Sequence, residues 1–211
     1  MSLTSAYDRG MPRLTPERRA MRRDQVLRAA VRCVIRSGFQ GLTMSEVIAE
    51  SGLSAGAVYG YFASKDALLA AVADQQLGGL AAVLDDFLRA STMGPPATPA
   101  EVLRALTEVV AAMKHTPDGD LSVAVVQVWG EAVLGGTVRD IMRPRLHEVE
   151  SRLVLLAERW RAAGLTRPDS DPRHVARVVM ALLPGYMLQQ LVLDGLPSAD
   201  FAAGLAALTQ R

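Results

Sequence analysis

The chain has 211 residues, a formal net charge of +1 and 50% hydrophobic residues, so it has room for a small domain joined to a larger one. Aromatic residues are few and alternating β-branched patterns are scarce, which predicts an all-α fold. A single cysteine, Cys33, excludes an intrachain disulfide, and the absence of a signal-peptide core or a long apolar run favours a cytoplasmic protein without membrane insertion.

Positive charge is concentrated near the N-terminus. Nine arginines fall between Arg9 and Arg36, against only Glu17 and Asp24. This excess attracts a phosphate backbone, although a solvated helix face has the same composition. We expect residues 1–14 to form a flexible basic arm. Together with Arg18 and Arg19, such an arm would enter a minor groove or follow the DNA backbone.

Three helices are predicted before residue 62. Thr15-Pro16-Glu17 starts the first helix, which runs to about Ser37 and ends at Gly38. The second covers about 43–51, because Thr43 and Glu46 have the spacing of a capping box. Gly52 provides a turn, and Ser54 caps a third helix that ends near Tyr61.

Six more helices follow, which makes about nine in all. They are expected at about 64–89, from 98, and at 119–135, 137–163, 171–194 and 198–210, separated by glycine- and proline-rich breaks. Pro144 lies inside one of these segments and should kink it or delay its regular start. Pro184 raises the same question in the segment 171–194.

The segment from Gly41 to Leu69 contains a specific motif. Its signature is Val58-Tyr59, Tyr61-Phe62, Ser64-Lys65-Asp66 and Leu68-Leu69. Over roughly residues 20–70 the chain resembles the DNA-binding domain of TetR/AcrR-family transcriptional regulators, with Tyr61 where histidine is commoner. The resemblance implies a helix-turn-helix domain at 15–66 and a ligand-binding and dimerisation domain at 67–211.

The candidate DNA-contact residues follow from this arrangement. The second helix of such a pair presents its N-terminal residues to base edges, and flanking elements bind phosphates. A lysine at a helix N-terminus opposes the helix dipole, and a phosphate partner would explain it. The candidates are Thr43, Ser45, Ser54, Ala55, Gly56, Ala57, Tyr59, Tyr61 and Lys65. A core position for one of the tyrosines and a solvated Lys65 are the alternatives.

The second half has more apolar residues than one buried stripe needs. The last two helices are the expected homodimer interface, which the resemblance also implies. An apolar cavity with a few polar groups would suit a hydrophobic small molecule. Its candidate wall residues are Met113, Gln127, Trp129, Tyr186, Met187 and Gln190. Simple core filling is the alternative for each of them.

No catalytic, metal or cofactor site is predicted. His115, His147 and His174 are scattered, and none has a neighbour at a known metal-ligand spacing. The leading hypothesis is therefore a ligand-responsive repressor that binds a palindromic DNA operator as a dimer. The alternatives are a regulator that activates or has no ligand, and a helical enzyme or lipid- or membrane-surface-binding protein with a basic N-terminal helix.

Overall fold

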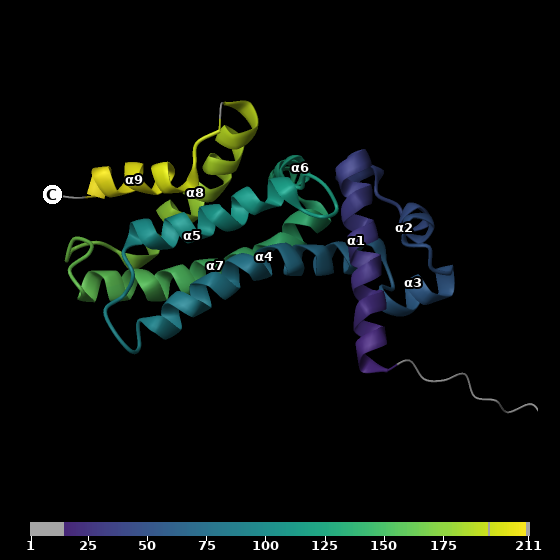
Figure 1. Ribbon diagram of the computed structural model, residues 1–211, viewed down its shortest axis with the longest axis horizontal. Coiled ribbons are helices and arrows are strands. Elements are labelled where there is room, and N and C mark those ends of the chain that lie inside the picture. Colours follow the sequence, from purple (N-terminus) through teal and green to yellow (C-terminus); the bar gives the residue numbers. More distant parts are fainter. Residues whose placement is uncertain (1–14, 194, 210–211) are drawn as a thin grey trace, which may run out of the picture.

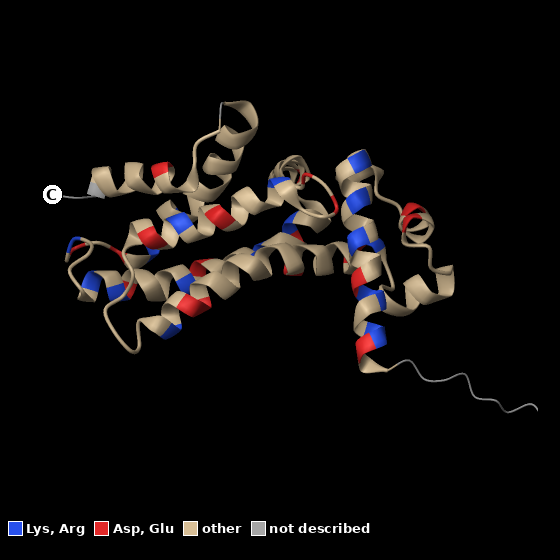
Figure 2. Cartoon of the chain, viewed as in Figure 1, with Lys and Arg blue, Asp and Glu red and all other residues tan. Residues whose placement is uncertain are grey.

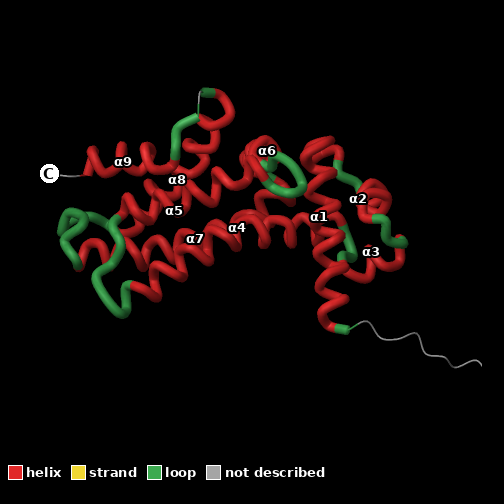
Figure 3. The backbone as a smooth tube through the Cα atoms, viewed as in Figure 1, coloured by secondary structure: helices red, strands yellow, loops and turns green. Residues whose placement is uncertain are grey.

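The computed structural model describes residues 15–193 and 195–209, which fold into nine α-helices and one turn of 3-10 helix. No strand occurs in these two ranges, and Figure 3 shows helices joined by loops. Helices α1 (Pro16–Gly41), α2 (Met44–Ser51) and α3 (Ala55–Tyr61) form one end of an elongated molecule (Figure 1). The all-α expectation is confirmed, and the predicted arm of residues 1–14 lies outside the described ranges.

Helix α1 begins where the sequence predicts. Thr15 Oγ1 accepts a hydrogen bond from Arg18 N at 3.3 Å, and Pro16 occupies the first helical position. At its other end Gly38 has a φ of 71°, a left-handed conformation that interrupts the helix before a last turn to Gly41. The predicted end at Gly38 is thus a break in the regular helix rather than its last residue.

Helices α2 and α3 are positioned by local polar contacts. Thr43 N donates to Glu46 Oε2 at 3.0 Å, and Glu46 N donates to Thr43 Oγ1 at 3.2 Å, which completes the predicted capping box. Gly52 adopts a φ of 67° after α2, and Ser54 Oγ then accepts from Ala57 N at 3.3 Å to start α3. The turn between the two helices is therefore determined by its own residues.

The remaining helices form a layered bundle. They are α4 (Lys65–Ala90), α5 (Pro99–Ala112), the 3-10 turn η1 (Met113–His115), α6 (Ser122–Leu134), α7 (Gly136–Ala162), α8 (Pro172–Val192) and α9 (Ser198–Thr209). Helix α4 packs along α7, α7 packs on α8, and α5 packs on α8 and α9 (Figure 1). Helix α6 contacts both α1 and α7, so it connects the N-terminal unit to the bundle.

The two internal prolines do not delimit helices. Helix α7 runs through Pro144 and α8 runs through Pro184, each as one helix. The predicted delay at Pro144 is therefore wrong. Proline has no N–H group, so one carbonyl of the preceding turn has no helical hydrogen-bond donor. Because Pro144 is exposed, this carbonyl lies on the side of the helix that faces solvent.

Two hydrophobic cores meet at α6. The N-terminal core contains the fully buried Val47 and Val58 and also Ala124 of α6, whereas the second core contains Leu121 just before that helix. Trp160 is fully buried in the second core and donates its Nε1–H to Ala97 O at 2.7 Å. A displacement of α6 would therefore change the packing of both cores.

Within the described ranges, α4 and α8 are long and apolar enough to cross a bilayer by length and composition. The sequence expectation that no segment reaches this length is corrected for these two helices. Core helices of globular proteins meet the same criterion. Here α4 packs on α1, α5 and α7, and α8 packs on α5, α6 and α7.

Candidate nucleic-acid interface and apolar cavity

The first turn of α3 presents small residues to solvent. Ser54, Ala55 and Gly56 are exposed, whereas Val58 on the opposite side is fully buried. A methyl group placed on the Cα atom of Gly56 would meet no atom within 4 Å. Figure 1 shows α3 at the end of the molecule, away from α5, α8 and α9. A partner surface could therefore approach the backbone of α3 closely.

Thr43 and Ser45 lie at the start of α2, the helix that precedes α3. Both are exposed, and the Thr43 hydroxyl also donates to Glu46 Oε2 at 3.0 Å within the capping box. A phosphate at this position would meet the free N–H groups of a helix N-terminus. The start of α2 is thus exposed and has the polarity to bind an anion.

The two tyrosines of α3 have different surroundings. Tyr59 is 49% exposed, whereas Tyr61 is half-buried and packs against the N-terminal core. Their spacing of two residues on a helix places them on different sides. Tyr59 is therefore the more available of the two for an external contact.

Lys65 has an internal partner. Its Nζ donates to Phe39 O at 3.2 Å and lies 5.5 Å from the centroid of the Phe39 ring. The carbonyl belongs to the last turn of α1, where helix carbonyls lack partners. The cation at the start of α4 therefore has a partner inside the protein, and its ammonium group keeps further N–H donors for a second contact.

Figure 2 shows basic residues along the length of α1, and their partners differ between its first and second halves. Arg18, Arg19 and Arg22 are exposed and form no ion pair with the described residues. Further along, three arginines are paired with carboxylates. Arg28 Nε lies 3.2 Å from Asp118, Arg32 binds Asp118 and Glu50 at 2.7 Å each, and Arg36 Nη1 lies 2.9 Å from Glu50. The sequence count thus overstated the free positive charge on α1.

Asp118 and Glu50 connect three parts of the chain. Glu50 lies on α2, and the adjacent guanidinium groups of Arg32 and then Arg36 hold its pKa below the ordinary 4.5. Asp118 lies in the loop before α6, where Thr116 Oγ1 donates to Gly119 O at 2.6 Å. The arginine row therefore fastens α1 to α2 on one side and to the start of α6 on the other.

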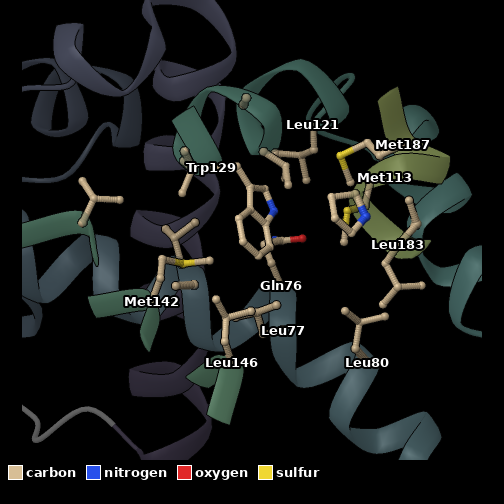
Figure 4. A pocket seen from close by; sticks show the side chains of 18 of the residues that line it. Gln76, Leu77, Leu80, Met113, Leu121, Trp129, Met142, Leu146, Leu183 and Met187 are labelled. Carbon is tan, nitrogen blue, oxygen red and sulfur yellow. The ribbon is translucent and has the colours of Figure 1, made fainter. Parts of the chain in front are cut away.

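An apolar cavity of about 120 Å³ lies where the two cores meet (Figure 4). Side chains from α1, α4, α6, α7 and α8 line it, together with residues near η1. They are Val31, Val34, Phe39, Leu69, Val72, Ala73, Gln76, Leu77, Leu80, Val110, Met113, Leu121, Ala124, Val125, Val128, Trp129, Val138, Ile141, Met142, Leu146, Val149, Met180, Leu183, Pro184 and Met187. None of them carries a charge.

The outer face of α8 is apolar and exposed. Val178, Leu188 and Val192 are 59%, 47% and 77% exposed, and the small residues Ala181 and Gly185 lie between them. Positions 178, 181, 185, 188 and 192 follow the alternating spacing of three and four that helices use to pack against another helix. Helix α9 adds the exposed Leu208. This face has the pattern of a helix-packing surface.

Known proteins share both the motif and the length of this chain. Residues 26–72 match the model of a family described as bacterial regulatory proteins, tetR family. An HTH-type transcriptional regulator BetI from Burkholderia cenocepacia is 30% identical over 180 residues, which cover 84% of this chain and 86% of that protein. The chain belongs to the TetR family. It is a DNA-binding transcriptional regulator with an N-terminal helix-turn-helix and a helical C-terminal region.

Several solved structures share the fold of this TetR-family regulator over nearly its whole length. A TetR transcription regulator from Haloarcula marismortui has a TM-score of 0.67 at 24% identity, covering 90% of this chain and 96% of that chain. The transcriptional regulator FadR from Bacillus subtilis, solved in complex with stearoyl-CoA, has a TM-score of 0.71 at 14% identity, covering 88% and 96%. At these identities the likeness concerns the fold.

Three of the six predicted wall residues line the cavity of this regulator. Met113, Trp129 and Met187 do so, whereas the other three have different positions. Gln127 faces α1, where its Oε1 would lie 3.1 Å from a Cβ atom on Gly38. Tyr186 hydrogen-bonds Ser198 Oγ at 3.1 Å and packs on Phe201, so it holds α9 against α8.

Gln190 also lies outside the cavity lining, because its side chain donates to Leu196 O in the loop before α9. Gln76 lies among Val72, Ala73 and Leu80 on the inner side of α4 and was not among the predicted wall residues. The sequence does contain a pattern that points to it. Residue 76 is seven positions after Leu69, which places it on the same, otherwise apolar side of the helix. Among the described residues, no group of three His, Cys, Asp or Glu side chains is placed to hold a metal ion.

Proposed function

We propose that the chain is a cytoplasmic, ligand-responsive repressor that binds a palindromic DNA operator as a homodimer. Residues 15–66 would bind DNA, and residues 67–211 would bind the ligand and the second copy. The observation that carries this proposal is the position of the cavity. Val34 and Phe39 of the N-terminal unit and Leu183 and Met187 of α8 line the same space. A molecule in the cavity would therefore touch both parts of the regulator.

The exposed start of α3 is the proposed reading edge. Ser54, Ala55, Gly56 and Ala57 would lie in the major groove, where small side chains allow the helix to approach thymine methyl groups. Thr43, Ser45, Tyr59, Tyr61 and Lys65 are the proposed contacts to the flanking backbone or base edges. Since few of these side chains form bidentate base contacts, DNA shape would contribute much of the sequence preference.

The apolar outer face of α8 supports the proposed dimer, with α9 beside it. Val178, Leu188 and Val192 would pack against the same residues of a second copy, because a two-fold axis brings identical surfaces together. Two linked half-sites bind more tightly than one, which a reading edge with few polar side chains requires. A palindromic operator follows from the symmetry of such a dimer.

Ligand control would act by shifting the equilibrium between two arrangements of the DNA-binding units. A ligand that binds one arrangement more tightly than the other shifts the equilibrium toward it. The resulting change in DNA affinity is limited by the difference between the ligand's affinities for the two arrangements. Helix α4 begins at Lys65 next to α3 and lines the cavity from Leu69 to Leu80. It is therefore the proposed path from the cavity to the DNA contacts.

DNA binding is tested with the full chain and the DNA upstream of its own gene. We expect a specific complex whose affinity falls steeply with salt, measured by fluorescence anisotropy. Vesicles containing anionic lipid serve as the comparison. Binding to these vesicles without any DNA complex would instead support the membrane-surface alternative. In a reporter strain, deletion of the gene should raise expression from the bound promoter, and lowered expression would identify an activator.

The dimer is tested by Leu188→Glu, with Leu155→Glu as the matched control. Leu155 is 48% exposed on α7, outside the proposed surface, and Leu188 is 47% exposed on α8. Only Leu188→Glu should convert the dimer to a monomer in analytical ultracentrifugation and weaken operator binding. A wild-type monomer, or dimers in both variants, would contradict the proposed surface.

A further inference from the structure

The cavity contains two polar groups that the protein itself does not satisfy. Of its lining residues only Gln76 and Trp129 carry a strong hydrogen-bonding side chain. Neither the Gln76 amide nor the Trp129 indole N–H has a hydrogen-bond partner among the described residues. In Figure 4 both side chains reach toward the centre of the lining residues, Gln76 from α4 and Trp129 from α6. The other tryptophan, Trp160, is bonded to Ala97 O.

The rest of the lining restricts the charge of a ligand. No lysine, arginine, histidine, aspartate or glutamate lines the cavity, so a buried carboxylate or ammonium group would have no opposite charge beside it. Burying an unpaired charge is far more costly than burying a neutral polar group that finds a hydrogen bond. The lining therefore favours a neutral occupant.

The two polar groups also restrict the kind of polar atom. The indole N–H of Trp129 only donates and so calls for an acceptor atom, whereas the amide of Gln76 has two N–H donors beside its own carbonyl oxygen. A carbonyl oxygen has two lone pairs and can accept from both. The cavity volume of about 120 Å³ is of the same order as that of a buried apolar cavity of about 150 Å³ that holds benzene, so the occupant is about one ring in size.

We propose that the cavity binds a small neutral molecule, mainly apolar and of about one ring, whose single carbonyl oxygen accepts hydrogen bonds from Gln76 and Trp129. This inference rests on the proposed ligand response, and it names the chemistry of that ligand. The carbonyl group would join α4 to α6, because each helix contributes one donor. A ligand of the same shape without the oxygen would leave both donors unpaired.

Four probes of nearly identical shape test the proposal on the full chain in the absence of DNA. Acetophenone carries a neutral carbonyl, isopropylbenzene has no oxygen, benzoate is an anion and benzamidine is a cation. Binding is measured by calorimetry and by the change in tryptophan fluorescence. We expect acetophenone to bind about fivefold to tenfold more tightly than isopropylbenzene, the range that one or two hydrogen bonds supply. Benzoate and benzamidine should show no saturable binding.

Two variants locate the hydrogen bonds. Gln76→Leu keeps the side-chain size and should remove most of the preference for acetophenone over isopropylbenzene while binding of isopropylbenzene persists. Trp129→Phe, followed by calorimetry, should reduce the same preference and provides the test if Gln76→Leu fails to fold. Saturable binding of either charged probe, no saturable binding of acetophenone, or an unchanged preference in the folded variants would overturn the proposal.

The experiments can contradict the proposed ligand chemistry and the proposed regulation independently of each other. If acetophenone binds with the expected dependence on Gln76 but leaves operator affinity unchanged, the cavity chemistry stands and the ligand response to this probe is refuted. If the operator complex forms and no neutral carbonyl probe binds, the DNA-binding function stands and the cavity proposal is refuted.

Discussion

The DNA-facing unit and the cavity are built in opposite ways. The start of α3 is exposed, made of small residues, and positioned by contacts between residues three apart, such as Ser54 with Ala57. The cavity is apolar and is lined by side chains from Val31 to Met187. The first site depends on local chain geometry, whereas the second depends on how distant helices pack. A substitution should therefore alter one site with little effect on the other, except where they share helices α1, α4 and α6.

Gly56→Glu is expected to have the largest effect on DNA binding without a matching effect on the rest of the fold. It places a negative side chain at the proposed reading edge, where no atom lies within 4 Å of the new Cβ atom. Repulsion from phosphates should weaken operator binding about 100-fold or more, with an unchanged melting temperature. Fluorescence anisotropy and thermal unfolding measure the two effects. Gly78→Glu on α4 is the control, because Gly78 is equally open and lies outside α2 and α3. Equal losses in both variants would remove Gly56 from the interface.

A matched pair of valines compares packing in the two regions. Val58 is fully buried in the N-terminal core, whereas Val128 is half-buried on the cavity wall. Val58→Ala should lower the free energy of unfolding by about 2 kcal/mol, and Val128→Ala by less than about 1 kcal/mol, because its neighbours already border empty space. Urea unfolding of both variants measures the difference. Equal costs would show that the wall is packed as tightly as the core.

Lys65 lies where the two regions join, so its substitution distinguishes an internal role from a DNA contact. Lys65→Ala should weaken operator binding about tenfold and lower the slope of affinity against salt by about one, as expected for one lost phosphate contact. Lys114→Ala, at an exposed lysine of η1, is the control. A lower melting temperature with unchanged affinity and slope would confine Lys65 to its bond with Phe39 O.

The smallest effect concerns Glu50 and acid pH. Arg32 and then Arg36 lower its pKa, so the folded protein prefers the charged form more than the unfolded chain does. This stabilisation is present above about pH 4.5 and is lost as the pH falls through the lowered folded pKa. Glu50→Gln should therefore melt a few degrees below wild type at neutral pH, and the gap should close in acid.

Melting curves from pH 7 to pH 3 follow this gap. Glu148→Gln, at an exposed α7 glutamate whose side chain has no ion pair with the described residues, should show no such closing gap. A gap for Glu50→Gln that stays constant with pH would show that its two ion pairs do not contribute to stability.

The difference in construction also explains what the sequence could predict. Most helix bounds, the capping box of Thr43 and Glu46 and the turn at Gly52 depend on neighbouring residues, so local patterns were sufficient for them. The cavity wall depends on which side of each helix faces inward. Trp129 faces the cavity, but Gln127, two positions earlier on α6, points toward Gly38. No local pattern distinguishes the two, because α6 is apolar on most of its surface.

The same reasoning applies to charge. Arg28, Arg32 and Arg36 are spaced as one polar stripe, and the stripe is present. Asp118, the partner of Arg28 and Arg32, is 86 residues away from Arg32 in the chain, so the sequence did not reveal that the stripe is neutralised. Gln76 is the opposite case. Its position on the stripe of Leu69 and Leu80 was readable, but polar residues near the end of an apolar run are common on half-buried helices.

The ion pairs between Asp118 and the arginines of α1 affect how DNA-binding domains can be exchanged between regulators. A chimera that joins residues 1–66 of this chain, here called the head, to the C-terminal domain of another regulator would lack Asp118. Arg28 would lose its carboxylate and Arg32 would keep only Glu50, so the transplanted head would carry more unpaired positive charge than it does here. Such a head would adhere to DNA of any sequence more strongly. A useful hybrid would have to carry an acidic residue in the loop that meets α1.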